Sequence, residues 1–227
     1  PGIDQGAVIR MLVDHTTVDH FITIPEGLSS VEIMAIVDDE ALLTGSVVNM
    51  PPEGSLLPET YHFAKGDSRD KIIFEMAKAR ETLLKKLWDD RAKDLPFKTK
   101  EEALVLASIV EKETGVSGER AKIAGVFINR LRIGMRLQSD PTVAFAVMDG
   151  AGKMDRPLTR ADLKLDHPYN TYVIKGLPPT PIANPGRAAI EAVLMPDSTK
   201  ALYFVADGSG GHAFANSLAE HNRNVAK

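Results

Sequence analysis

The sequence predicts an α+β fold with a helical centre and a second half built from short strands and turns. The stretches 68–93, 99–114 and 117–134 carry apolar residues at helical spacing, so they predict three consecutive helices. After residue 135 the chain is rich in Pro and Gly, and its apolar runs are short enough for strands. This change of pattern predicts a mixed fold rather than a helical bundle.

A smaller α/β unit is expected over residues 1–48. Gly2–Asp14 has the apolar spacing of a short helix, and Val18–Ile24 alternates and is rich in β-branched and aromatic residues, as strands are. Ser29 with Glu32 three positions later forms a capping box, which predicts the start of a second helix.

The larger domain is expected over residues 49–227. It opens with turns rich in Pro and Gly and continues into the long amphipathic helix at about 68–93. Thr99 and Glu102 form a second capping box and predict the start of the next helix. We expect residues 99–227 to form the core of this domain.

Short elements are expected in the rest of the larger domain. The segment 135–150 is expected to mix strands with turns, and 159–163 and 186–196 to form short helices. Residues 201–215 consist of two apolar runs around a Gly-rich turn, which predicts a hairpin.

Composition and charge exclude several classes of function. The net charge is −4 with Lys and Arg scattered, so a nucleic-acid partner is not expected. There is no cysteine, so the chain has no disulfide and no thiolate metal ligand. None of the six histidines forms a His-Glu-x-x-His or His-x-His pattern. We therefore expect no metal or other cofactor. No run of about 18 apolar residues occurs. Because the chain starts at Pro1, we expect that a signal or anchor was removed.

Two carboxylates end an apolar helix in the stretch "LASIVEKET", residues 106–114. At about 100° per residue, Glu111 lies one turn above the small residues Ala107 and Ser108, whereas Glu113 lies above bulkier aliphatics. Apolar surroundings and a helix C-terminus both raise the pKa of a carboxyl, and a general acid needs a raised pKa. For either carboxylate taken alone, a structural ion pair is the better explanation, and the small residues favour Glu111 only modestly as the one with space for a ligand.

Two polar segments are candidates for contacting a sugar. One is the segment 138–140, which follows a helix end and precedes a proline; the alternative to sugar contact is that it forms a plain turn. The other is "YNTY", whose tyrosines either stack on a sugar or fill a core. The candidates are Gln138, Ser139, Asp140, Tyr169, Asn170 and Tyr172.

Several blocks together resemble one known family, from about residue 20 to the C-terminus and in the family's order. The blocks are "ITIPEGLSS", "EGSLLPETY", "ASIVEKET", "GVFINRLRIGMRLQSDPTV", "YNTY", "GLPPTPIANPG" and "LYFVADGSGGHAF". They are similar to the endolytic murein transglycosylases of the MltG and YceG type.

The resemblance implies an enzyme that cuts peptidoglycan glycan strands internally. Its reaction breaks the β-1,4 bond between N-acetylmuramic acid and N-acetylglucosamine and leaves a 1,6-anhydro-muramyl end. The resemblance further implies an N-terminal membrane anchor, a periplasmic or extracytoplasmic location at the inner membrane, and peptidoglycan synthases as partners. It also implies that the N-terminal unit is LysM-like and contacts glycan.

In the family the catalytic glutamate falls in the "VEKE" block, which the resemblance matches to Glu111. A lytic enzyme needs no activated water, because the C6 hydroxyl of the sugar attacks C1, so one carboxyl serves as acid and then as base, whereas hydrolases use two. Glu113 is then expected in a structural ion pair. The alternatives are a hydrolytic muramidase and a non-catalytic glycan-binding or scaffold protein.

Overall fold

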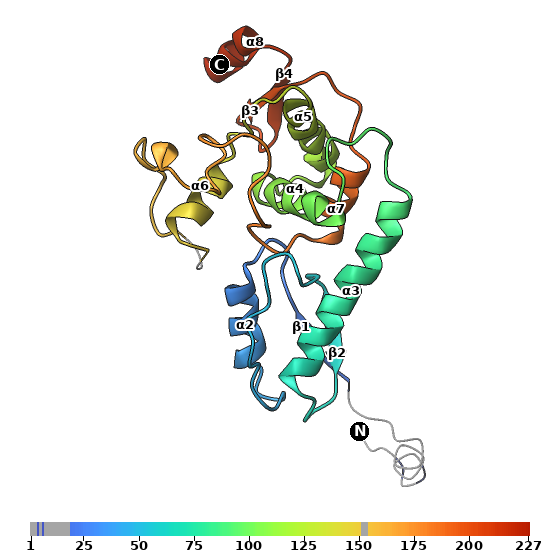
Figure 1. Cartoon of the computed structure of the whole chain (residues 1–227). Coiled ribbons are helices and arrows are strands. Elements are labelled where there is room, and N and C mark those ends of the chain that lie inside the picture. The colour runs from blue at the N-terminus through green and yellow to red at the C-terminus, as the bar shows by residue number, and fades with distance from the viewer. Residues whose placement is uncertain (1–3, 5, 7–18, 151–153) are drawn as a thin grey trace.

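The computed structural model describes residues 4, 6, 19–150 and 154–227 and shows two lobes joined by one long helix (Figure 1). The fold mixes helices and strands, which agrees with the predicted α+β class. Apart from Asp4 and Gly6, the residues of the helix expected at Gly2–Asp14 lie outside the described ranges.

The N-terminal lobe is a two-stranded sheet covered by helices. Strand β1, His20–Thr23, pairs antiparallel with β2, Thr60–Phe63. Helix α2, Ser30–Asp39, begins at the capping box predicted from the sequence. The core of this lobe extends beyond residue 48, the boundary expected from the sequence, because the strand that pairs with β1 comes after that point.

Helix α3, Arg69–Asp89, connects the two lobes and is capped by Ser68. Its first turns bury Ile72 and Met76 in the N-terminal lobe. Its last turns bury three leucines, Leu83, Leu84 and Leu87, in the larger lobe. One helix therefore belongs to both hydrophobic cores and links their positions.

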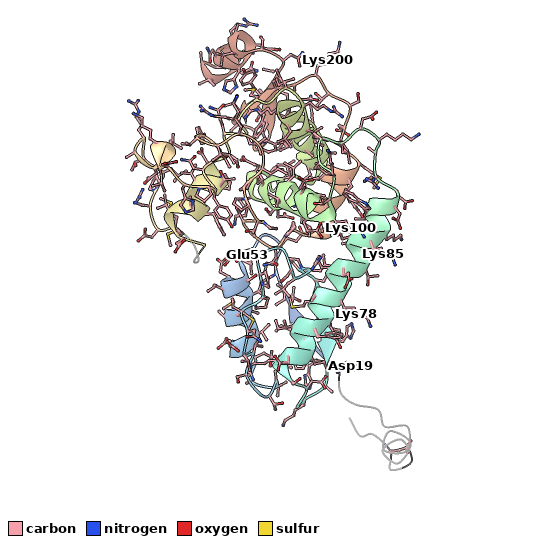
Figure 2. The ribbon with its side chains drawn as sticks, viewed as in Figure 1. Asp19, Glu53, Lys78, Lys85, Lys100 and Lys200 are labelled. Atoms are coloured by element: carbon pink, nitrogen blue, oxygen red, sulfur yellow. The ribbon has the colours of Figure 1, made fainter. Side chains whose placement is uncertain are left out.

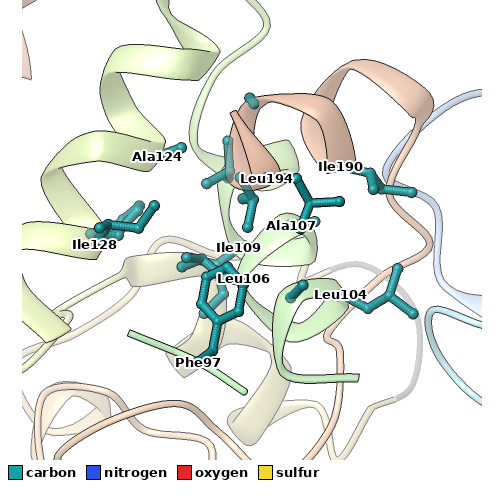
Figure 3. Packing of buried hydrophobic residues seen from close by; sticks show 14 of the residues in the cluster. Phe97, Leu104, Leu106, Ala107, Ile109, Ala124, Ile128, Ile190 and Leu194 are labelled. Carbon is teal, nitrogen blue, oxygen red and sulfur yellow. The ribbon is translucent and has the colours of Figure 1, made fainter. Parts of the chain in front are cut away.

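The larger lobe is built around helix α4, Lys100–Glu113, which starts at the predicted Thr99–Glu102 capping box. Every residue from Ala103 to Val110 is buried. Helices α5, Arg120–Arg132, and α7, Arg187–Leu194, pack against α4 and enclose it (Figure 3). A helix that is apolar on all sides has to be surrounded in this way, and the next polar side chains emerge only at its C-terminal end.

Smaller elements complete the larger lobe. They are the 3₁₀ turns Ser117–Glu119 and Asp162–Lys164, helix α6 (Asp140–Val147), strands β3 (Tyr203–Ala206) and β4 (His212–Ala215), and helix α8 (Leu218–Val225).

The predicted hairpin forms, with β3 and β4 antiparallel. The expectation of strands within 135–150 is wrong, because Ser139 stands at the N-cap of α6 and Pro141 lies in its first turn, where proline is tolerated. Residues 148–150 form a turn, as expected. No helix in the described ranges is long and apolar enough to cross a membrane.

Candidate active site

The C-terminal turn of α4 sends two carboxylates to different sides of the helix. Glu111 and Glu113 are two residues apart, about 200° around the axis, so they meet different neighbours. The helix ends at Glu113, with Thr114 as its C-cap. The surroundings of each carboxyl determine whether it is free to exchange a proton.

Glu111 is bound on both of its oxygens. Its Oε1 accepts a hydrogen bond from Nη2 of Arg120 at 3.2 Å, and its Oε2 accepts one from the backbone N–H of Gly186 at 2.9 Å. Its side chain is 4% exposed and that of Arg120 is 12% exposed. The same Nη2 lies 3.5 Å from Oε2 of Glu26, a residue of the N-terminal lobe. The ion pair that the sequence suggested for Glu113 therefore belongs to Glu111, which lies where the two lobes meet.

Asn184 makes a second link between the lobes, next to Gly186. It is fully buried, and its Oδ1 accepts from the backbone N–H of Leu56 at 3.0 Å. Its amide nitrogen donates to Ser30 Oγ at 3.1 Å and Glu53 Oε2 at 3.3 Å. Figure 2 shows Glu53 at the junction of the lobes. Burial raises the pKa of the Glu53 carboxyl, which hydrogen bonds from Ser30 partly offset.

Glu113 has a different kind of partner, a neutral hydroxyl. Ser139 Oγ donates to Glu113 Oε1. Burial is the largest influence on the carboxyl and raises its pKa, and the charge of Asp140 adds to this effect. The Ser139 hydrogen bond and the nearby charges of His212 and Arg130 act in the opposite direction without cancelling it. Glu113 therefore has the raised pKa that a general acid needs.

Asp140 and Tyr172 extend the polar group around Glu113. The Tyr172 hydroxyl donates to Asp140 Oδ1 at 2.6 Å. The loop that carries Tyr172 is fixed against the start of α6, because Ser139 N donates to Thr171 Oγ1 at 2.9 Å and the hydroxyls of Thr171 and Thr142 lie 2.8 Å apart. Three of the predicted site residues, Ser139, Asp140 and Tyr172, are thus brought together beside Glu113.

The other three predicted residues have different surroundings. Asn170 is fully buried, its amide donates to the carbonyls of three residues between 162 and 165, and its Oδ1 accepts from Tyr172 N. Its polar groups hold the loop, so they are not free for a sugar. The Tyr169 hydroxyl lies 2.6 Å from Thr180 Oγ1, and its ring packs on Phe145. Gln138 is exposed, with φ of +50°.

A groove of about 510 Å³ runs from this group toward the N-terminal lobe. Residues 27–29 and Glu32 line one side, and Asp140 and Phe145 of α6 line the other together with its C-cap, Met148. Of the polar group around Glu113, Asp140 is the residue that lines the groove, and the adjacent Ser139 connects it to Glu113.

Sequence reasoning gave no role at the site to the charged residues that surround the two carboxylates. Arg120 and Arg130 lie in α5, and Glu119 contacts His212 from the preceding 3₁₀ turn. Arg130 comes two residues after the apolar run 123–128 of α5, and this was the one local signal in the sequence. Among the described residues, no group of three or more His, Asp or Glu side chains is arranged to hold a metal ion.

These features define an α+β protein of two lobes, with a buried carboxyl at the end of a core helix beside a groove between the lobes. The chain belongs to the YceG-like family, which it matches over residues 1–227. The resemblance read from the sequence is thereby confirmed.

Three relatives give the extent of the similarity. An endolytic murein transglycosylase of Bacillus subtilis (strain 168) is 36% identical, over 98% of this chain and 69% of the relative. One of Streptococcus pneumoniae serotype 2 is 33% identical, over 89% of this chain and 40% of the relative. The crystal structure of a YceG-like protein from Listeria monocytogenes is 33% identical with a TM-score of 0.74, over 98% of this chain and 81% of that one. Both curated relatives are named as enzymes, in agreement with the enzyme class predicted here.

Proposed function

We propose that this protein is an endolytic murein transglycosylase that cleaves the bond between N-acetylmuramic acid and N-acetylglucosamine and leaves a 1,6-anhydro-muramyl end. Family membership and the names of the relatives support the activity on peptidoglycan. The chain covers between 40% and 69% of those relatives, so the activity of the whole protein is part of the proposal.

The single observation that carries the mechanism is the contrast between the two carboxylates. Glu111 is occupied by Arg120 and Gly186, whereas Glu113 has a raised pKa and a hydroxyl partner, Ser139, next to Asp140, which lines the groove. We therefore propose Glu113 as the acid and base, and keep Glu111, to which the sequence resemblance assigned this role, as the competing assignment.

The reaction then balances with one carboxyl. Glu113 gives its proton to the glycosidic oxygen as the bond from that oxygen to C1 breaks, and the leaving sugar departs with a C4 hydroxyl. The C6 hydroxyl of the muramyl residue attacks C1, and its proton passes to the Glu113 carboxylate. The residue ends protonated as it began, so no water and no second carboxyl nucleophile are needed.

The groove is proposed to hold the glycan strand. Ser139, Asp140 and Tyr172 are proposed to position the sugar at the reacting bond, since they surround Glu113. Gln138 and Tyr169 remain proposals for contacts further along the strand. Asn170, which the sequence suggested as a sugar contact, is assigned to holding the loop.

Further parts of the proposal follow from the family resemblance alone. They are a LysM-like, glycan-contacting role for the N-terminal lobe, peptidoglycan synthases as partners, and an N-terminal anchor that holds the enzyme at the extracytoplasmic face of the membrane.

The decisive experiment is digestion of purified sacculi by the wild type, Glu111→Gln and Glu113→Gln, with mass spectrometry of the products. We expect anhydro-muramyl products from the wild type and a loss of about 100-fold or more in Glu113→Gln, the contribution typical of a general acid. Glu111→Gln, compared at equal folded fraction by circular dichroism, should stay within about tenfold of the wild type, because its carboxyl is not the proton donor.

Each other outcome points to a different conclusion. Full activity in Glu113→Gln with loss in Glu111→Gln reverses the assignment. Reducing sugar ends identify a hydrolytic muramidase. Binding to sacculi without any product, at every pH tried, favours a glycan-binding scaffold.

A further inference from the structure

Lys112 stands between the two carboxylates at the end of α4 and lines the groove. Its side chain leaves the helix about 100° from that of either glutamate. Its Nζ donates to the carbonyl of Gly27 at 3.1 Å, and a Cβ added at Gly27 would lie 3.6 Å from Lys112 Cδ. The alkyl chain of the lysine thus lies against the backbone of the N-terminal lobe, and its ammonium is held at the wall of the groove that residues 27–29 form.

This ammonium has donors to spare. An ammonium carries three N–H donors, and the Gly27 carbonyl accepts one of them. The side chain is exposed, and no carboxylate in the part of the chain that the structure describes forms an ion pair with it. The nearby carboxylates of Glu26 and Glu111 pair with Arg120 instead. The positive charge of Lys112 is therefore available to a ligand in the groove.

The other three charged residues that line the groove already have partners. Arg156 donates two hydrogen bonds to Asp162, at 2.6 and 3.1 Å. Glu32 accepts two hydrogen bonds within the capping box of α2, at 2.9 and 2.8 Å. Asp140 accepts the tyrosine hydroxyl described above. Lys112 is thus the one charged side chain lining the groove whose single contact is to a neutral carbonyl.

Much of the remaining lining is apolar. A ligand that suits a free cation beside an apolar wall carries a carboxylate close to a small apolar group. The O3 substituent of a muramyl residue has this chemistry, because the lactyl group joins a methyl and a carboxyl on one carbon, and a stem peptide continues from it with alanine and an acidic residue. N-acetylglucosamine has a plain hydroxyl at O3. The apolar residues include Ala144, Phe145, Met148, Leu158 and Ile182.

We propose that Lys112 binds a carboxylate on the O3 substituent of a muramyl residue and so makes the groove select this sugar over N-acetylglucosamine. The inference rests on the proposed function, in which a muramyl residue lies at the reacting bond. Asp140 lines the opposite side of the groove, and its negative charge repels a carboxylate there. The substituent is therefore directed toward Lys112, which fixes the way round in which the sugar lies.

The test uses ligands without a bond of the type that the proposed reaction breaks, so binding is measured in the wild type without turnover. They are chitobiose, which has no lactyl group, the disaccharide N-acetylglucosaminyl-β-1,4-N-acetylmuramic acid with its bare lactyl carboxylate, and the same disaccharide with L-alanyl-D-glutamate on the lactyl group. Dissociation constants come from NMR shifts of the backbone amides that line the groove. The two muramyl ligands separate the possible sources of the carboxylate, the lactyl group and the stem peptide.

We expect at least one muramyl ligand to bind the wild type about fivefold more tightly than chitobiose, the upper range for an exposed ion pair. The preference should fall in high salt, which screens the charge. Lys112→Met should abolish the preference and leave the affinity for chitobiose within about twofold, and Lys112→Arg should retain the preference because it retains the charge. A lysine that only ties the lobes together would, when replaced, weaken all three ligands alike.

Lys85→Met is the matched control, since Lys85 is an exposed lysine of α3 that does not line the groove (Figure 2), and it should bind all three ligands as the wild type does. Equal affinities of the wild type for the three ligands would overturn the inference, as would a preference that persists in Lys112→Met. If Lys112→Met does not fold, the wild type decides, and a preference that high salt leaves unchanged overturns it.

Failure of the proposed function has a different signature. Sacculi that yield no anhydro-muramyl products, together with a muramyl preference that depends on Lys112, contradict the reaction and leave the binding site in place. Release of these products by an enzyme that shows no muramyl preference contradicts the role of Lys112 alone.

Discussion

Glu111 and Glu113 stand two residues apart at the end of α4, and a guanidinium contacts the first whereas a serine hydroxyl contacts the second. Glu111 lies where the lobes join, and Glu113 contacts Ser139, which adjoins the groove-lining residue Asp140. One helix end thus supplies a structural link, Glu111, and a candidate acid, Glu113. Substituting the first should mainly change stability, and substituting the second should mainly change activity.

Replacing Glu111 with glutamine should lower the free energy of unfolding by about 2–3 kcal/mol. The change leaves the Arg120 guanidinium, 12% exposed, without its closest carboxylate. Glu26→Gln is the matched control, since Glu26 contacts the same Nη2 but is 41% exposed. It should cost less than about 1 kcal/mol, as exposed pairs do. Urea unfolding measures the free energy of unfolding of both variants. Equal losses of stability would show that the Glu111 contact contributes no more than the exposed Glu26 contact.

The Glu113→Gln variant should become more stable relative to the wild type as pH rises. The folded state raises the pKa of Glu113 above its usual value near 4.5, mainly through burial. A raised pKa means that the stability contributed by this carboxyl is fully present below its unfolded pKa and is lost as pH rises through its folded pKa. Glutamine does not ionise and avoids this loss. Urea unfolding at about pH 5 and about pH 8 tests the sign, and a stability difference that is constant between them contradicts it.

Local features of the fold could be read from the sequence, because they join residues close along the chain. Both capping boxes, Ser29 with Glu32 and Thr99 with Glu102, form as predicted. The β3–β4 hairpin also forms across its Gly-rich turn. The capping boxes join residues three positions apart and the hairpin joins residues six to twelve apart, so these hydrogen bonds depend little on distant parts of the chain.

The roles of the two carboxylates could not be read in this way. The helical wheel correctly placed small residues beneath Glu111 and took them to leave room for a ligand. In the structure Ser108 Oγ accepts the backbone N–H of Ile182, and Gly186 of the same segment binds Glu111. A loop more than 70 residues away in sequence fills the space. Likewise the Ser139 contact to Glu113 depends on packing between α4 and the start of α6, which no local pattern reveals.

A methyl group added at Gly54 should destabilise the junction between the lobes. Gly54 has φ of +74°, and an added Cβ would lie 2.5 Å from Pro181 Cγ. Gly45 is the matched control, because it has the same φ of +74° with no atom within 4 Å of an added Cβ. Gly45→Ala should cost about 1 kcal/mol for backbone strain alone, and Gly54→Ala about 1–3 kcal/mol more for the forced contact. Thermal and urea unfolding measure the difference, and equal costs would mean that Pro181 moves away freely.

Removing the Tyr172 hydroxyl should lower turnover by about tenfold, equivalent to about 1.4 kcal/mol in the activation free energy. This hydroxyl donates to Asp140 at 2.6 Å, and Asp140 adjoins Ser139, the partner of Glu113. Without the donor, the Asp140 carboxylate is free to turn and no longer holds a fixed position beside the acid.

Tyr61→Phe is the control for this change. It also removes a hydroxyl with one hydrogen bond, but that bond of 2.7 Å is to the carbonyl of Leu57 in the N-terminal lobe. Release of anhydro-muramyl products from sacculi, followed over time, should be slowed in Tyr172→Phe and nearly unchanged in Tyr61→Phe. Equal rates in the two variants would place Asp140 outside the acid–base group, whereas the predicted difference ties its fixed orientation to proton transfer by Glu113.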